Sequence, residues 1–183
     1  MVVVVFNCFH WMGYHCTRQL LYNGHEVVGV DEIDTPLKEK LYMYVGRNSH
    51  FQHFNTIEER DNHSHHSKNE PWIKISQREI IISTNGNSDV ALPVPPLFGE
   101  WMKMESQDIE TIDDLKLWIL AQRAKYVGDF FEVVIDHLEK GEVSSLLEIN
   151  FSNTARATQP QEILERVWEV TRHKELNYKE IDN

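Results

Sequence analysis

The N-terminal part of the chain alternates between apolar runs and one amphipathic stretch. Residues 2–6 are an unbroken run of β-branched and aromatic side chains, which is typical of a central parallel strand with helices on both faces. Over residues 12–22 the apolar positions recur at helical spacing, and Gly24 follows where a helix commonly ends. Residues 26–31 form a second apolar run that ends in an acid. This order predicts a strand–helix–strand unit.

The alternation continues after this unit. Thr35 followed by Pro36 is typical of an N-cap and the first helical position, and Gly46 predicts the end of that helix. Residues 50–54 are expected to form a third strand, and Thr56 with Glu59 has the spacing of a capping box for a short helix. The polar stretch over 61–70 is expected to be an exposed loop.

The pattern is less decisive in the second half of the chain. The isoleucines of residues 72–84 favour strand, although a helix is also compatible with them, and residues 112–120 fit a short helix or a strand. Asn85-Gly86 is a candidate turn. Strands are predicted over 90–94 and 146–151, and helices over 127–139 and 160–172. Strands that alternate with helices indicate an α/β architecture.

Size and charge limit the classes of function. The 183 residues fit one domain, and the formal net charge of −11 opposes binding to nucleic acid or to anionic lipid. The apolar run at the start is too short to span a membrane and has no basic flank like that of a signal peptide. Cys8 and Cys16 are expected to be unbridged thiols, which suits a reducing compartment. We therefore expect a cytoplasmic protein without nucleic-acid or membrane partners.

The N-terminal unit also resembles a known family. The loop over residues 7–13 (Asn-Cys-Phe-His-Trp-Met-Gly) and the phrase Gly-His-Glu-Val-Val-Gly-Val-Asp over residues 24–31 are similar to the opening of the extended short-chain dehydrogenase/reductase family. This family comprises the NAD-dependent sugar-nucleotide epimerases and dehydratases. The resemblance implies a Rossmann-like parallel sheet with flanking helices, here reduced in size, with a small C-terminal α/β portion.

Later segments extend this resemblance. Residues 94–99 resemble the family's strand that leads into a Tyr-Gly-Pro loop beside the substrate, and residues 126–134 resemble its Tyr-Val-x-Asp helix start. Residues 147–153, with the helix that follows, resemble its C-terminal strand and helix. The likeness covers about residues 1–60 and 90–173. It implies one domain over 1–183, with a nucleotide-binding half over 1–60 and a remnant of the substrate lobe over 90–183.

Three departures from the family bear on activity. Asn7 and His10 stand where the family has the first two glycines of its phosphate loop, and only Gly13 is kept. None of the six tyrosines is followed four residues later by a lysine, so the acid/base pair of the family is absent. The middle of the chain, about thirty residues, is too short for the two further strand–helix units that normally carry this pair.

The resemblance selects Asn7, His10, Gly13 and Asp31 as the candidate cofactor-binding residues, with NAD or NADP as the implied cofactor. Asn tolerates the positive φ that the first glycine provides. The third glycine position, Gly13, has a packing role or a phosphate-binding role. Asp31 would hold an adenine ribose, or it caps a strand. The histidines of residues 63–66 have chelating spacing but lie in a polar loop, so no metal site is expected.

These observations predict a truncated epimerase/dehydratase-like Rossmann protein without hydride-transfer catalysis and without catalytic residues of the family type. It would act as a module that binds a nucleotide or nucleotide-sugar ligand, or a partner protein in a homo- or hetero-oligomer. The alternative is an NAD(P)-dependent epimerase, dehydratase or reductase that uses unconventional acid/base residues.

Overall fold

A computed structural model describes residues 1–63, 70–84, 89–104, 109–149, 151 and 161–179. The chain divides into two compact units. The first, which we call the sheet unit, contains residues 1–94 and 128–149, and the second, the smaller unit, contains residues 95–127 and 150–183.

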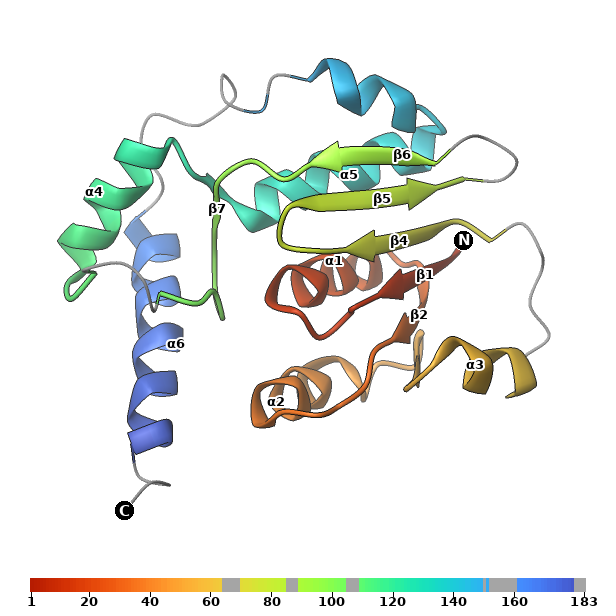
Figure 1. The fold of residues 1–183 in the computed structure, drawn as a ribbon, viewed down its shortest axis with the longest axis horizontal. Coiled ribbons are helices and arrows are strands. Elements are labelled where there is room, and N and C mark those ends of the chain that lie inside the picture. The colour runs from red at the N-terminus through yellow and green to blue at the C-terminus, as the bar shows by residue number, and fades with distance from the viewer. Residues whose placement is uncertain (64–69, 85–88, 105–108, 150, 152–160, 180–183) are drawn as a thin grey trace. The chain divides into compact units, whose positions relative to one another are not determined.

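A six-stranded, mostly parallel sheet forms the centre of the sheet unit (Figure 1). Its strand order is β3-β2-β1-β4-β5-β6, in which β1 pairs parallel with β2 and β4, and β2 pairs parallel with β3. The last two strands are antiparallel to their neighbours. The strands are β1 (Val2–Phe6), β2 (Glu26–Val30), β3 (Phe51–Phe54), β4 (Trp72–Ile75), β5 (Glu79–Ser83) and β6 (Val90–Pro93). The expected α/β, Rossmann-like fold class is confirmed.

Across β1, β4, β5 and β6 one face of this sheet is apolar. Val5 lies in register with Ile73, which pairs with Ile82, and Ile82 pairs with Val90. All four side chains are buried. Residues that pair directly across neighbouring strands point to the same face of a sheet, so these four side chains share one face. The valine run of β1 therefore forms the centre of the core, as its apolar pattern predicts.

The helices of the sheet unit begin and end close to their predicted bounds. They are α1 (Trp11–Tyr22), α2 (Pro36–Val45), α3 (Ile57–His63) and α5 (Val127–Lys140), whose first residue belongs to the smaller unit. Thr35 caps α2 by accepting a hydrogen bond from the amide of Lys38 at 3.3 Å, and Gly46 is its C-cap. The hydroxyl of Thr56 likewise accepts a hydrogen bond from the amide of Glu59 at 3.1 Å. The carboxylate of Glu59 accepts from the amide of Asn55, whereas the expected capping box requires the amide of Thr56.

The two ambiguous segments are settled by the structure. Residues 72–84 contain the antiparallel pair β4 and β5, joined by a tight turn in which Ser76 accepts from the amide of Glu79 at 3.1 Å. Residues 112–122 form the helix α4 (Ile112–Gln122), and Thr111 with Asp114 forms a complete capping box at its start. The side chains of Thr111 and Asp114 accept hydrogen bonds from each other's backbone amides. These bonds stabilise the first turn of a helix, so the segment is helical. The turn expected at residues 85–86 lies outside the described residues.

Two predictions are wrong. Residues 143–148 form a short 3₁₀ helix, Val143–Glu148, where a late strand over 146–151 is expected. Val143 and Leu146 are buried and Leu147 is exposed, so the apolar positions recur every three residues and not every two. The polar loop predicted from residue 61 begins too early, since α3 continues to His63.

The smaller unit contains the remaining elements. A short parallel pair, β7 (Leu97–Phe98) and β8 (Lys125–Tyr126), lies in a two-stranded sheet, accompanied by α4 and by α6 (Gln161–Lys179). Trp101 is buried and has a φ of 70°, a conformation that costs free energy for a bulky side chain. The polypeptide therefore turns sharply just after β7, next to Glu100.

Both thiols are expected to be unreactive in the folded protein. Cys8 and Cys16 are fully buried and unbridged, and burial raises the pKa of each thiol well above its ordinary value. Since the thiolate is the reactive form, a colorimetric thiol titration of the native chain at mildly alkaline pH should detect neither cysteine. The same titration in denaturant should detect both. Rapid labelling of either thiol without denaturant would contradict this packing.

Candidate functional site

The loops at the carboxyl end of β1 meet where the strand order changes direction. The chain proceeds from β1 to β2 and β3 on one side, and β4 pairs with β1 on the other. In open α/β sheets ligands bind in the crevice at such a switch point. Residues 7–10, which join β1 to α1, lie at this point.

Asn7 fixes the first turn of this loop. Its φ of 58° lies in the left-handed region, a conformation that asparagine tolerates better than most other residues. Its amide donates to the carbonyl of Val30 at 3.0 Å, and its side-chain nitrogen donates to the carbonyl of Ile75 at 2.7 Å. Asn7 is thus held between the ends of β2 and β4, on both sides of β1.

Gly13 allows α1 to approach this turn closely. A Cβ atom at this position would lie 2.0 Å from the carbonyl oxygen of Asn7. No heavier residue fits without moving the backbone. The geometry therefore gives Gly13 a packing role, one of the two roles that the sequence leaves open.

His10 is the N-cap of α1 and has an extended conformation, with φ −64° and ψ 146°. Its side chain does not cap the helix. Its amide donates to the carbonyl of Asn7 at 3.0 Å, and its carbonyl accepts from the amide of Tyr14 at 2.8 Å. The first-turn amides of α1 thus have no side-chain cap within the described residues, which is the arrangement that attracts an anion to a helix N-terminus.

Asp31 closes the other side of the loop. Its carboxylate is buried and accepts a hydrogen bond from the amide of Phe9 at 2.8 Å and one from Nζ of Lys38 at 3.0 Å. The carbonyl of Asp31 accepts from Nε2 of His53 at 2.7 Å. The acid at the end of β2 therefore ties the loop after β1 to the first turn of α2.

Lys38 is the counter-charge of this carboxylate. Its Nζ also contacts Oδ1 of Asp34 at 2.9 Å and the carbonyl of Glu32 at 2.9 Å. Burial acts to lower the pKa of Lys38, but the hydrogen bonds to Asp34 and Asp31 outweigh it and raise the pKa overall. A ribose hydroxyl that approached Asp31 would thus meet a carboxylate whose two oxygens already accept hydrogen bonds from the protein.

The sequence gives no direct sign of this ion pair. Lys38 lies in the first turn of α2, three residues after its cap, and looks like an ordinary surface lysine. Its pairing with Asp31 depends on the path of the polypeptide between β2 and α2, which the sequence does not reveal. The four predicted site residues, by contrast, do lie around one loop. Asn7 and His10 belong to it, Gly13 packs against the carbonyl of Asn7 from the first turn of α1, and Asp31 accepts from the amide of Phe9 within it.

A second polar cluster lies in the smaller unit and was missed by sequence reasoning. The hydroxyl of Tyr126 donates to Oε2 of the buried Glu100 at 2.9 Å. Nε of Arg166 donates to Oε1 of Glu100 at 2.5 Å, and Nη2 of Arg166 donates to the Tyr126 hydroxyl at 2.9 Å. Because Glu100 and Tyr126 are both buried, this cluster holds α6 against the β7–β8 pair and presents no open phenol to a substrate.

No metal centre emerges. Among the described residues no group of three or more histidine, cysteine or acidic side chains could hold a metal ion. His63 is at the end of α3, where its ring contacts the carbonyl of Glu59 at 2.8 Å, and residues 64–66 lie outside the described part of the chain.

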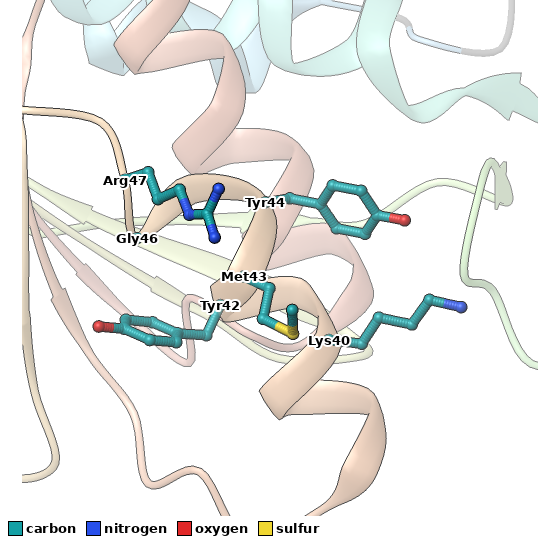
Figure 2. A pocket seen from close by; sticks show the side chains of 6 residues that line it. All are labelled: Lys40, Tyr42, Met43, Tyr44, Gly46 and Arg47. Carbon is teal, nitrogen blue, oxygen red and sulfur yellow. The ribbon is translucent and has the colours of Figure 1, made fainter.

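A depression adjoins the C-terminal end of α2 (Figure 2). Its lining residues come from this one segment, and Figure 2 shows Tyr44 and Lys40 pointing to the same side of the helix, away from Tyr42. Ligand pockets bury most of a ligand's surface, whereas a ligand here would contact only this segment, so we do not count the depression as a second candidate site. The residues that line it are Lys40, Tyr42, Met43, Tyr44, Gly46 and Arg47.

Comparison with known proteins adds no assignment: no family model, curated protein or solved structure matches the chain. In the part of the chain that the structure describes, every helix is too short or too polar to cross a membrane.

Proposed function

We propose that this chain is a Rossmann-type nucleotide-binding module, similar to a truncated NAD-dependent epimerase/dehydratase, that does not catalyse hydride transfer. The observation that carries the proposal is the loop at the carboxyl end of β1. Asn7 in the left-handed region, Gly13 packed against its carbonyl, and Asp31 at the end of β2 make the turn that a phosphate-binding loop requires.

The absence of hydride chemistry rests on the sequence. No tyrosine has a lysine four residues further along the chain, and proton transfer in the resembled family depends on this pair. The hydrogen-bonded phenol and cation in the smaller unit, Tyr126 and Arg166, are no substitute, because the phenol is buried and donates to Glu100. A nucleotide bound at the loop would therefore be held without being reduced or oxidised.

The ring of His10 is expected to limit the affinity for a dinucleotide. It replaces the glycine at which the backbone of such a loop normally approaches the pyrophosphate. Since the φ of His10 is −64°, alanine fits this position without strain. We expect a His10→Ala variant to bind NAD about tenfold more tightly than the native chain, which corresponds to about 1.4 kcal/mol.

Isothermal titration with ADP, NAD, NADH and NADPH tests both parts of this proposal, with turnover of nucleotide sugars followed in parallel. His50→Ala is the matched control, because His50 is exposed just before β3 and its replacement should leave the affinity unchanged. Heat of binding without any turnover is the expected result. NAD-dependent turnover by the purified chain would overturn the catalytic half of the proposal. No heat with any of the four nucleotides would overturn the binding half.

A further inference from the structure

The carboxylate of Asp31 is bound by groups of the protein itself. Its Oδ2 accepts from the amide of Phe9 at 2.8 Å, and its Oδ1 accepts from Nζ of Lys38 at 3.0 Å. A carboxylate oxygen can accept a second hydrogen bond, but a sugar hydroxyl has to reach it from solvent. The side chain of Asp31 is only 6% exposed. The ribose hydroxyls of a nucleotide therefore find no accessible acceptor in this carboxylate.

The ammonium group of Lys38 is equally committed. Its three hydrogens are its only donors, and three oxygen atoms surround it. Oδ1 of Asp31 lies 3.0 Å from Nζ, and Oδ1 of Asp34 lies 2.9 Å from it. The carbonyl oxygen of Glu32 is the third acceptor, at 2.9 Å. Lys38 therefore has no hydrogen left for a phosphate group on the 2′ position of a ribose, as long as these three contacts hold.

Three rings pack together beside Asp31. The ring of Phe9 is fully buried, and its centroid lies 5.1 Å from that of His53 and 5.8 Å from that of Tyr42. The rings of Tyr42 and His53 are 5.5 Å apart. Nε2 of His53 contacts the carbonyl oxygen of Asp31 at 2.7 Å. Side chains of the protein, and not open solvent, therefore lie next to Asp31 on the side of β3.

We propose that Lys38 determines the specificity of this site by closing Asp31 to sugar hydroxyls, so that nucleotides bind through their phosphate groups with or without the 2′- and 3′-hydroxyls. In dinucleotide-binding folds the acid at the end of the second strand normally accepts from the ribose. Here the ion pair with Lys38 takes the place of that contact. The inference rests on the proposed function, because it concerns the ligand of the same loop.

Calorimetric titration of the native chain with ADP and with 2′,3′-dideoxy-ADP measures the contribution of the hydroxyls. We expect the two dissociation constants to agree within about twofold. If ADP binds at least about tenfold more tightly, as one hydrogen bond to a charged group would provide, the inference is wrong although nucleotide binding stands. A similar preference for NADP over NAD would also overturn it, because the ammonium of Lys38 would then be available to a 2′-phosphate.

Lys38→Met should give the site the discrimination that it lacks. Once Oδ1 of Asp31 has lost the ammonium, it can accept from a sugar hydroxyl, so this variant should bind ADP at least about tenfold more tightly than dideoxy-ADP. Equal binding of the two ligands by the folded variant would overturn the inference. If the native chain binds neither ligand, the proposed function fails. The variant then still decides, because binding of ADP alone supports the role of Lys38 and binding of neither ligand excludes it.

A second variant and a matched control complete the test. Asp31→Asn should change the affinities for ADP and dideoxy-ADP by the same factor, whereas a loss confined to ADP would show that Asp31 contacts the ribose and would overturn the inference. Lys140→Met also breaks a lysine–aspartate pair, with Asp136, and should leave the ratio of affinities unchanged. Its neighbour Glu139 contacts His25 just before β2, at the opposite end of the strands from the loop. Circular dichroism confirms that each variant is folded.

Discussion

A Gly13→Ala substitution is expected to destabilise the protein by more than about 3 kcal/mol, well beyond the usual cost of an added methyl group. The methyl carbon would lie 2.0 Å from the carbonyl oxygen of Asn7 and 3.0 Å from Cα of Cys8. Both are backbone atoms, which cannot rotate away as the end of a side chain can. To accommodate the methyl group, α1 would have to move away from the turn that Asn7 holds between β2 and β4.

Urea unfolding followed by circular dichroism measures this loss, with Gly24→Ala as the control. Gly24 has a φ of 81° and open space around its Cβ position, so the control carries only the conformational cost of about 1–2 kcal/mol. If Gly13→Ala proves no more destabilising than Gly24→Ala, α1 does not pack on Asn7 as described.

The second large effect is expected from Arg166→Met in the smaller unit. It removes the Arg166 guanidinium from Glu100, whose side chain is only 4% exposed, so that a buried carboxylate loses this cation. Breaking a buried ion pair in this way typically costs 3–5 kcal/mol. Because the Arg166 side chain is itself 52% exposed, water screens part of the pair and we expect about 2–3 kcal/mol.

A double-mutant cycle separates this effect from lost packing. Adding Glu100→Gln to Arg166→Met removes the uncompensated charge and should recover part of the stability, so the two changes are not additive. Lys140→Met is the control, since it breaks the exposed pair with Asp136 and should cost less than about 0.5 kcal/mol. The structural role of the cluster would be contradicted if Arg166→Met lowered the free energy of unfolding no more than Lys140→Met does, and if the effects of Arg166→Met and Glu100→Gln were additive.

Much of the sheet unit could be predicted because its signals are local. The apolar run of β1 needs no knowledge of its neighbours to indicate a central strand, and Thr35-Pro36 marks the start of α2 through its own cap. Asn7 could be predicted to take a positive φ since the resemblance places it at a glycine position. These inferences depend on residues that lie close together in the sequence.

Other features depend on contacts between distant residues and could not be predicted. Glu100 and Arg166 are 66 positions apart, and no periodicity in either segment indicates that they meet. A strand was expected over residues 146–151 because this segment is rich in aliphatic side chains. The structure instead has the 3₁₀ helix Val143–Glu148, in which only Val143 and Leu146 are buried. The ion pair between Lys38 and Asp31 likewise could not be predicted, because it depends on the path of the polypeptide from β2 into α2.

The central claim, that a nucleotide binds at the carboxyl end of β1 in the sheet unit, is tested most directly by mapping amide chemical shifts during titration with ADP. For a chain of 21.6 kDa, two-dimensional ¹H–¹⁵N spectra resolve individual amides. The account predicts the largest shifts at the amides of Phe9, Trp11, Met12 and Gly13, with a smaller change at Asp31. Shifts confined to α5 or to the smaller unit, or an unchanged spectrum, would contradict it.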